Sequence, residues 1–325
     1  MHRDYATAAR NLLIYAELIH ALRALDAAGV PVIVLKGAAL AETIYGSIVD
    51  RPMGDADLLA RIRDRDMARS ALEAAGFKAQ VDARRRFGLA GMAFATEITF
   101  YRTAGTLIEL HWNLTSSAWI LRPSALDVEA LFQAAQPLEI DGLRTLQLSP
   151  PDTLLHLCVH LVQHGFAHPV GYTDISHLLS RYQPFPWEAF LSRVKQFRLR
   201  TICYFPLEVS ASALSAPIPQ AILDALRPPG WQQRLVWLIA DPGRVLSGEA
   251  NYPPERNSLL HLVVADRPLE VLRTVAWFFF PGPRHLTDRY ELRGRISAYL
   301  ACLWHPLVVL WRGAVIAFML AWGRR

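Results

Sequence analysis

The stretch from residue 32 to residue 61 constrains the fold of this chain more than any other part. Residues 32–35 form a short apolar run typical of a buried strand, and Lys36-Gly37 makes a tight exit from that strand. Good helix formers fill residues 38–45, and after a loop a second apolar run begins at Asp55. A strand, a glycine turn, a helix and a second strand-like run therefore follow in order.

The neighbouring segments extend this pattern. The expected elements are helices over residues 7–28 and 64–75 and strands over residues 77–81, 97–102 and 106–112. Gly29 and Gly76 are the stop signals of the two helices. Thr103-Ala104-Gly105 separates the last two strands by the spacing of a hairpin. The first 115 or so residues therefore predict a small mixed sheet with helices.

Beyond residue 145 the pattern changes to helix after helix. Ser149 followed by Pro150 is a helix start signal, and proline-rich joints punctuate the remainder without any visible repeat. A chain of 325 residues also exceeds the usual size of one domain. We expect an α+β catalytic domain over residues 1–145 and an α-helical domain over residues 146–325, with the active site at their junction.

Three acidic side chains carry the candidate chemistry. Asp55 and Asp57 stand two apart at the start of a predicted strand, so their side chains point to the same side, about 7 Å apart along the strand. In the strand over residues 106–112, alternation places Glu109 and His111 together on one face. If this strand lies beside the Asp55 strand, three carboxylates gather, and such hard oxygen ligands suit Mg²⁺.

Clustered carboxylates that bind Mg²⁺ favour phosphoryl transfer. In such sites, two ions roughly 3.5 to 4 Å apart stabilise the attacking and leaving oxygens of an in-line displacement. The Lys36-Gly37 turn can present backbone N–H groups to a triphosphate, and Lys36 either adds its charge there or forms an internal ion pair. Arg51, just before the acid pair, either contacts phosphate or locks the loop.

This ordered set of motifs resembles a known family, the uncharacterised nucleotidyltransferases of the DNA polymerase β-like superfamily. The matching features are Leu35-Lys36-Gly37 with Ala39-Leu40, Tyr45, Arg51, Asp55-Ala56-Asp57-Leu58-Leu59 and Ile108-Glu109-Leu110-His111-Trp112. They cover roughly the first third of the chain. The same L-K-G and R-x-x-x-D-x-D pattern is also similar to toxins of the abortive-infection type.

The resemblance implies a polymerase β-like core and Mg²⁺-dependent transfer of a nucleoside monophosphate from NTP to an acceptor. It makes Asp55, Asp57 and Glu109 the catalytic metal ligands. The further residues expected to bind the nucleotide or line its site are Lys36, Gly37, Arg51, His111, His160, His164 and Asp174. Two features depart from the superfamily: Lys36-Gly37 replaces the usual Gly-Ser or Gly-Gly, and the third acid is Glu instead of the commoner Asp.

The acceptor is open at this stage, and so are two other functions. A peptide, a sugar, an RNA end or another protein are the candidates, and the resemblance favours an acceptor from a natural-product or surface-polysaccharide pathway. One alternative is a toxin-like enzyme that modifies RNA or protein. The other is a non-catalytic scaffold that binds nucleotide or associates with a membrane.

A row of histidines in the helical half admits three interpretations. His156, His160 and His164 recur at intervals of four, which places them on one helical face, with His168 just beyond. They can pack and hydrogen-bond, contact substrate or bind zinc, although no nearby Cys or acid completes a zinc site before Asp174. The resemblance favours a structural or pocket-lining role, in which Asp174 orients a histidine or caps the next helix.

Composition and the end of the chain bear on location and partners. Of the 34 basic residues 31 are Arg, scattered without a stripe, so nothing favours duplex nucleic acid as a partner. Three distant cysteines and an amino terminus without an apolar core predict a cytoplasmic protein. Residues 299–322 are long and apolar enough for a membrane span, but Arg312 interrupts them. The flanking arginines at 293, 295, 324 and 325 favour a helix at a membrane surface or on a partner, and packing on the chain's own helices is the other interpretation.

Overall fold

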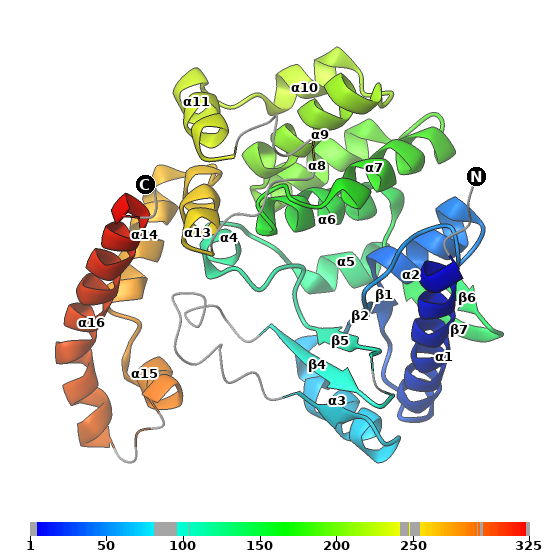
Figure 1. Ribbon diagram of the computed structural model, residues 1–325, viewed down its shortest axis with the longest axis horizontal. Helices are drawn as coiled ribbons and strands as arrows, with labels where there is room; N and C mark the ends of the chain where they lie inside the picture. Colours follow the sequence, from blue (N-terminus) through cyan, green and yellow to red (C-terminus); the bar gives the residue numbers. More distant parts are fainter. Residues whose placement is uncertain are drawn as a thin grey trace.

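A computed structural model describes residues 5–80, 96–103, 105–240, 247, 254–290, 292 and 295–322 (Figure 1). Its strands form one mixed sheet in the order β3-β4-β5-β2-β1-β7-β6. The strands are β1 (Ile33–Val34), β2 (Ala56–Leu59), β3 (Lys78–Ala79), β4 (Glu97–Tyr101), β5 (Ile108–His111), β6 (Gln136–Ile140) and β7 (Leu143–Gln147). The predicted α+β architecture, a mixed sheet followed by a helical region, is confirmed.

The pairing of β2 with β5 positions the acidic residues. These two strands are parallel, and their register sets Asp57 opposite Glu109. β4 and β5 form the expected antiparallel hairpin, in which Glu97 lies opposite His111. β1 runs antiparallel to β2 on the other side. Neighbouring strands thus bring together acids that are 52 residues apart in the chain.

The two faces of the sheet have different environments. Ala56, Leu58 and Ile108 point to a core shared with α1 and α3. Leu59 belongs to a second core, shared with the helices that follow the sheet. Because side chains alternate along a strand, Asp57 and Glu109 lie on the same face as Leu59. The acids therefore face the helical part of the protein, and the opposite face is apolar.

One hairpin was not predicted from sequence. β6 and β7 are antiparallel and joined at Asp141-Gly142, where both residues have positive φ angles of 50° and 76°. An Asp-Gly pair between strands is the usual signal of such a turn, so the information was present in the sequence. β7 pairs in parallel with β1 and widens the sheet.

The described helices fall into two groups along the chain. Those of the sheet region are α1 (Tyr5–Ala27), α2 (Lys36–Leu40) continued by a π-helix (Ala41–Tyr45), a 3-10 turn (Ile62–Asp64), α3 (Arg65–Ala74), α4 (Ala118–Leu121) and α5 (Val128–Ala134). Those after the sheet are α6 (Pro150–Gln163), α7 (Pro169–Arg181), α8 (Trp187–Phe197), α9 (Arg200–Leu214), α10 (Gln220–Leu226), α11 (Gly230–Ile239), α13 (Pro254–Val263), α14 (Pro268–Phe279), α15 (Pro283–Tyr290) and α16 (Arg295–Trp322).

Helix α6 begins where the sequence predicted. Ser149 caps it by accepting a hydrogen bond from the backbone N–H of Asp152, with Pro150 in its first turn. α6 to α10 gather on one side of the sheet (Figure 1). α7 packs closely on α6 at Gly171, where a Cβ would lie 2.9 Å from Leu161 Cδ2. The division of the chain at residues 145 and 146 stays a prediction.

The C-terminal helix α16 lies at the edge of the molecule beside α14 and α15 (Figure 1). His305 anchors it, because its ring contacts the Tyr290 hydroxyl at 2.7 Å and the Phe278 carbonyl at 3.0 Å. A row that includes Ile296, Leu303 and Leu307 remains exposed. In the part of the chain that the structure describes, no helix is both long and apolar enough to cross a membrane. Arg293, Arg324 and Arg325 lie outside the described residues, and peripheral membrane contact stays a prediction.

A buried ion pair joins the sheet region to the helices. Arg51 donates two hydrogen bonds to Asp174 of α7, from Nε to Oδ1 at 2.9 Å and from Nη2 to Oδ2 at 2.7 Å. Asp174 is fully buried and also accepts a hydrogen bond from the Tyr45 hydroxyl at 2.8 Å. Asn11 of α1 supports the loop by donating to the backbone carbonyl of Arg51 at 2.8 Å.

Removal of one partner of this pair is expected to destabilise the protein strongly. Arg51→Met leaves the Asp174 carboxylate buried and unpaired, which typically costs about 3 to 5 kcal/mol of unfolding free energy. Arg51→Met with Asp174→Asn removes both charges and keeps a partner for Tyr45, so it should recover most of that loss. Urea unfolding followed by tryptophan fluorescence tests this, and equal stability of the single and double variants would contradict it.

Candidate active site

A cavity of about 350 Å³ lies between the polar face of the sheet and helices α6 and α7. Its floor carries Asp55, Asp57 and Glu109. The opposite wall comes from the helical part, and its polar residues are His160, Gln163, His164, His168 and Asp174. A volume of this size suits a small-molecule site, where a few polar groups converge. The structure thus places all ten sequence-predicted site residues around one cavity.

Asp57, Glu109 and His111 form the tightest group of potential ligands. One ligand atom from each lies within 4.8 Å of the other two. His111 Nε2 is 2.9 Å from Asp57 Oδ1 and 3.4 Å from Glu109 Oε2. Its Nδ1 is 3.2 Å from Glu97 Oε2. Asp55 lines the same cavity but lies outside this group.

Lys36 reaches the same group from the first turn of α2. Its Nζ lies 3.0 Å from Asp57 Oδ1, and its side chain is 14% exposed. Its backbone has a positive φ of 38°, an unusual conformation for a side chain with a Cβ. Gly37 fixes this geometry because a Cβ there would lie 2.7 Å from Arg51 Nη1 and 2.9 Å from Met53 Cγ. Only glycine fits between the helix start and the loop that precedes β2.

The buried charges of this site set one another's protonation. Burial alone would raise the pKa of Asp57, but Lys36 and His111 hold it well below its ordinary value. Burial alone would lower the pKa of His111, but hydrogen bonds to Asp57, Glu109 and Glu97 raise it well above its ordinary value. Burial and the Asp57 charge raise the pKa of Asp55 to about 6. The site is therefore a buried network of negative charge with two cationic side chains inside it.

The donor set fits a divalent cation. Carboxylate oxygens of Asp57 and Glu109 are hard ligands of the kind that Mg²⁺ prefers, and Asp55 adds a third carboxylate to the cavity. As a neutral imidazole, His111 adds a nitrogen ligand, which also suits Mn²⁺ or Zn²⁺. As an imidazolium, it is a counter-ion of the acids instead. The sequence had placed Asp55 among the first ligands and His111 beside them, and the geometry groups His111 more closely with Asp57 and Glu109.

The sequence matches a known family over residues 2–215, the family described as uncharacterised nucleotidyltransferase. The chain belongs to this family. A search of curated proteins gives no match. Among solved structures, ANT(2″)-Ia in complex with adenylyl-2″-tobramycin is 12% identical, with a TM-score of 0.35, and the alignment covers 66% of this chain and 96% of that one. An antigenic nucleotidyltransferase-like protein from Paracoccidioides brasiliensis is 17% identical, with a TM-score of 0.38 and coverage of 66% and 92%.

In this nucleotidyltransferase, Arg51 and Asp174 form an ion pair with each other. Both line the cavity, but each satisfies the other's charge through two hydrogen bonds. Of the two interpretations of Arg51, the geometry corresponds to a residue that locks the loop. Asp174 contacts Tyr45 and Arg51 in the described part of the chain, and it caps neither α7 nor a histidine.

Three histidine rings lie against one another along the cavity wall, from His160 in the last turn of α6, His164 at the end of that helix and His168 just before α7. The ring centroids of His160 and His164 are 4.5 Å apart, those of His164 and His168 are 4.6 Å apart, and those of His160 and His168 are 5.3 Å apart. The only described group with metal-ligand spacing is the acid group, so the zinc interpretation gains no support from the geometry. Burial lowers the pKa of His164 to about 4 and that of His160 well below its ordinary value. The histidine part of the wall opposite the acids is thus polar but uncharged near pH 7.

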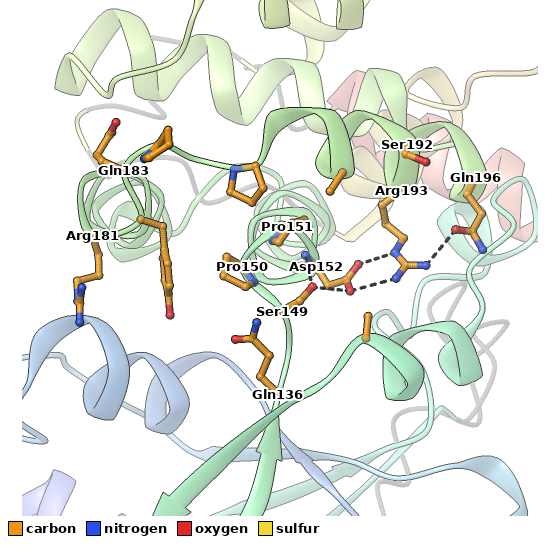
Figure 2. Close-up of a pocket in the computed structure, with 15 residues that line it drawn as sticks. Gln136, Ser149, Pro150, Pro151, Asp152, Arg181, Gln183, Ser192, Arg193 and Gln196 are labelled. Carbon is orange, nitrogen blue, oxygen red and sulfur yellow. Dashed lines mark hydrogen bonds and ion pairs between the residues drawn. The ribbon is translucent and has the colours of Figure 1, made fainter.

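A larger hollow of about 700 Å³ lies elsewhere, around the start of α6 (Figure 2). Its main charged groups satisfy each other, because Arg193 donates to Asp152 at 2.7 Å and to Gln196 at 3.0 Å. Ser149 also donates to Asp152, at 2.8 Å. Figure 2 shows these side chains turned toward one another. This hollow holds a structural network at a helix start, and the candidate chemistry lies in the smaller cavity.

Two polar residues of the cavity, Glu97 and Gln163, were not predicted from the sequence. Glu97 contacts His111 from β4, and Gln163 lines the wall from the last turn of α6. Glu97 could have been found by extending the predicted hairpin register, since it faces His111 across the β4 and β5 pair. Gln163 lies outside the row of histidines and gave no comparable signal.

His156 should make the stability of the protein sensitive to acid. It is buried, and both ring nitrogens lack a hydrogen-bond partner among the residues that the structure describes. Burial, followed by the Lys36 charge, lowers its pKa to about 3. Between pH 6.5 and about 3 the unfolded chain binds a proton that the folded chain does not, so stability falls as pH falls. His156→Leu should remove about one proton from the difference between the unfolded and folded chains. Below pH 6.5 the unfolding free energy of this variant should therefore fall less steeply than that of the wild type, by about 1.4 kcal/mol per pH unit. Urea unfolding at pH 7, 6 and 5 tests this, and parallel pH profiles of the two proteins would contradict it.

Proposed function

We propose that this nucleotidyltransferase transfers a nucleoside monophosphate from an NTP to a small acceptor with the help of Mg²⁺. The observation that carries the proposal is the register of β2 and β5, which sets Asp57 against Glu109 on the floor of the cavity. Asp57 and Glu109 would hold the metal, with Asp55 and His111 beside them. The predicted catalytic set of Asp55, Asp57 and Glu109 is kept, and His111 is added to it.

The proposed reaction follows from the charge distribution. An acceptor hydroxyl loses its proton to solvent as its oxygen bonds to the α-phosphorus, the bond from the α-phosphorus to the oxygen that bridges it to the β-phosphorus breaks, and pyrophosphate leaves with that oxygen. A bound divalent cation supplies charge stabilisation to the attacking and leaving oxygens. The Lys36 ammonium at the cavity floor is placed to neutralise phosphate charge. Gly37 and the Arg51–Asp174 pair keep the surrounding backbone in place, and positioning of this kind does much of the catalysis in phosphoryl transfer.

The helical wall is the proposed acceptor side. His160, His164 and His168 make ring contacts with one another, and neutral imidazoles can both donate and accept hydrogen bonds. Hydroxyl and amino groups of an acceptor therefore suit this wall. The position of the cavity between the sheet and helices α6 and α7 favours a small biosynthetic acceptor, such as a sugar or a peptide end, over a folded macromolecule. Modification of RNA or protein is the second candidate, and it would require a flexible end that enters the cavity.

Release of pyrophosphate that depends on Asp57 is the first expected result. The wild-type protein is incubated with each of the four NTPs, MgCl₂ and a pool of sugars, amino sugars and hydroxyl-bearing peptides. Asp57→Asn should lower pyrophosphate release at least about a hundredfold, because it weakens a contribution of several kcal/mol to the transition state. Asp50→Asn is the matched control, since Asp50 is an exposed acid of the same loop region.

Two outcomes would count against this proposal. Equal release by wild type and Asp57→Asn would show that the acid group does not carry the reaction. Binding of NTP without release of pyrophosphate in any acceptor pool would favour the non-catalytic scaffold. Circular dichroism of Asp57→Asn separates loss of activity from loss of fold.

The acceptor wall leads to a separate expectation. His164→Leu should raise the KM for the acceptor about tenfold, because it removes one hydrogen-bonding partner from a partly buried site, and should change the KM for the NTP little. His20→Gln, on α1 away from the cavity, serves as the control. A larger effect on the NTP than on the acceptor would place the nucleotide, instead of the acceptor, against this wall.

A further inference from the structure

Two side-chain nitrogens converge on one oxygen of the candidate metal site. Lys36 Nζ lies 3.0 Å and His111 Nε2 lies 2.9 Å from Asp57 Oδ1. Asp57 is only 3% exposed, so the chain itself supplies nearly all the positive charge around this carboxylate. Asp55 and Glu109 also interact with the Lys36 ammonium. Lys36 is therefore held inside the group of acids that would bind a divalent cation.

A metal ion and this ammonium cannot share the same place. Mg²⁺ binds carboxylate oxygen at about 2.0 to 2.1 Å, so an ion on Asp57 Oδ1 would lie next to Lys36 Nζ. Charges of the same sign repel strongly at such distances, and burial leaves little water to screen them. The backbone of Lys36 belongs to the first turn of α2, next to Gly37, where there is no room for a Cβ beside Arg51 and Met53. The flexible four-carbon side chain is the part of Lys36 that can exchange partners.

We propose that Lys36 is an internal counter-ion that competes with the metal for Asp57 and moves to the triphosphate when nucleotide binds. This inference rests on the proposed nucleotidyl transfer for the identity of the second partner. Metal alone must displace the ammonium from the Asp57 carboxylate, whereas metal with a triphosphate offers the ammonium a new anionic partner. Metal and nucleotide therefore bind cooperatively, and by linkage each raises the affinity of the other by the same factor.

This exchange of partners, from Asp57 to the triphosphate, suits a lysine at position 36. A lysine side chain is a compact charge on a flexible stem, suited to exchange one oxygen partner for another. Its exposed fraction of 14% and its place on the cavity floor leave it open to a ligand in that cavity. In this proposal Lys36 forms the internal ion pair when the cavity is empty and contacts phosphate when nucleotide is bound.

Calorimetry with Mg²⁺ alone tests the competition directly on the full chain. Lys36→Met should bind Mg²⁺ about tenfold more tightly than wild type, a factor within the usual range of coupling between sites. Lys36→Arg keeps the charge and should stay close to wild type. Lys195→Met removes an equal charge from the exposed end of α8 and should also stay close to wild type. Equal Mg²⁺ affinity of Lys36→Met and wild type would overturn the proposal.

The coupling is tested with the four α,β-methylene NTP analogues. One of them should tighten Mg²⁺ binding to the wild type about tenfold, and this gain should be largely lost in Lys36→Met. An equal gain in both proteins would overturn the transfer of Lys36 to the triphosphate. The experiment with Mg²⁺ alone does not involve nucleotide, so failure of nucleotidyl transfer and failure of the competition give different results.

NMR on the wild-type protein tests the same competition without any variant, so the result does not depend on whether Lys36→Met folds. The chain has three lysines, Lys36, Lys78 and Lys195, so lysine labelled with ¹³C gives a short and assignable set of signals. Saturation with Mg²⁺ should shift the Cε signal of Lys36 and leave those of Lys78 and Lys195 in place. A Lys36 signal that stays unchanged at saturating Mg²⁺ would overturn the proposal.

Discussion

The burial of the Asp57 carboxylate is the constraint on which the rest of the site depends. A charge in an interior is costly unless other charges and hydrogen bonds compensate it. Here Lys36 and His111 supply the compensation at 3.0 and 2.9 Å. Each of these partners requires structure of its own, since Lys36 needs the strained start of α2 and His111 needs the β4 and β5 hairpin. The first strands and helices of the chain are thus organised around one carboxylate.

The helical region completes the site and cannot be regarded as an independent attachment. It supplies the wall of the cavity through α6, and through α7 it supplies Asp174, which holds Arg51 and the loop before β2. The core reflects the same dependence, because Leu59 of the sheet packs in one cluster with residues of α6 and α9. Asp174 is fully buried, so moving it away from Arg51 would leave an unpaired charge in the interior, which costs much free energy. The ion pair therefore holds the loop and the helices in one arrangement.

The cavity combines two opposite electrostatic environments. The floor is rich in carboxylates and holds Lys36 and His111 as cations, whereas the wall presents imidazoles that burial and the Lys36 charge keep neutral. A site of this kind can bind a metal and phosphate at one side and an uncharged polar molecule at the other. The same arrangement makes the helical part sensitive to acid, because buried neutral histidines oppose protonation.

Local sequence patterns predicted the individual strands and helices and the acids of the candidate site. Alternation along residues 106–112 placed Glu109 and His111 on one face, and the Asp55 and Asp57 spacing did the same for the first acids, because the side-chain period of a strand is fixed by its backbone. The Asp141-Gly142 turn is also a local feature of the sequence, although it was not predicted. Contacts between distant segments depend on the folded structure: the register of Asp57 with Glu109, the pairing of Arg51 with Asp174, and the position of Lys36 beside Asp57. Such contacts depend on the packing of whole elements, which no local pattern of residues specifies.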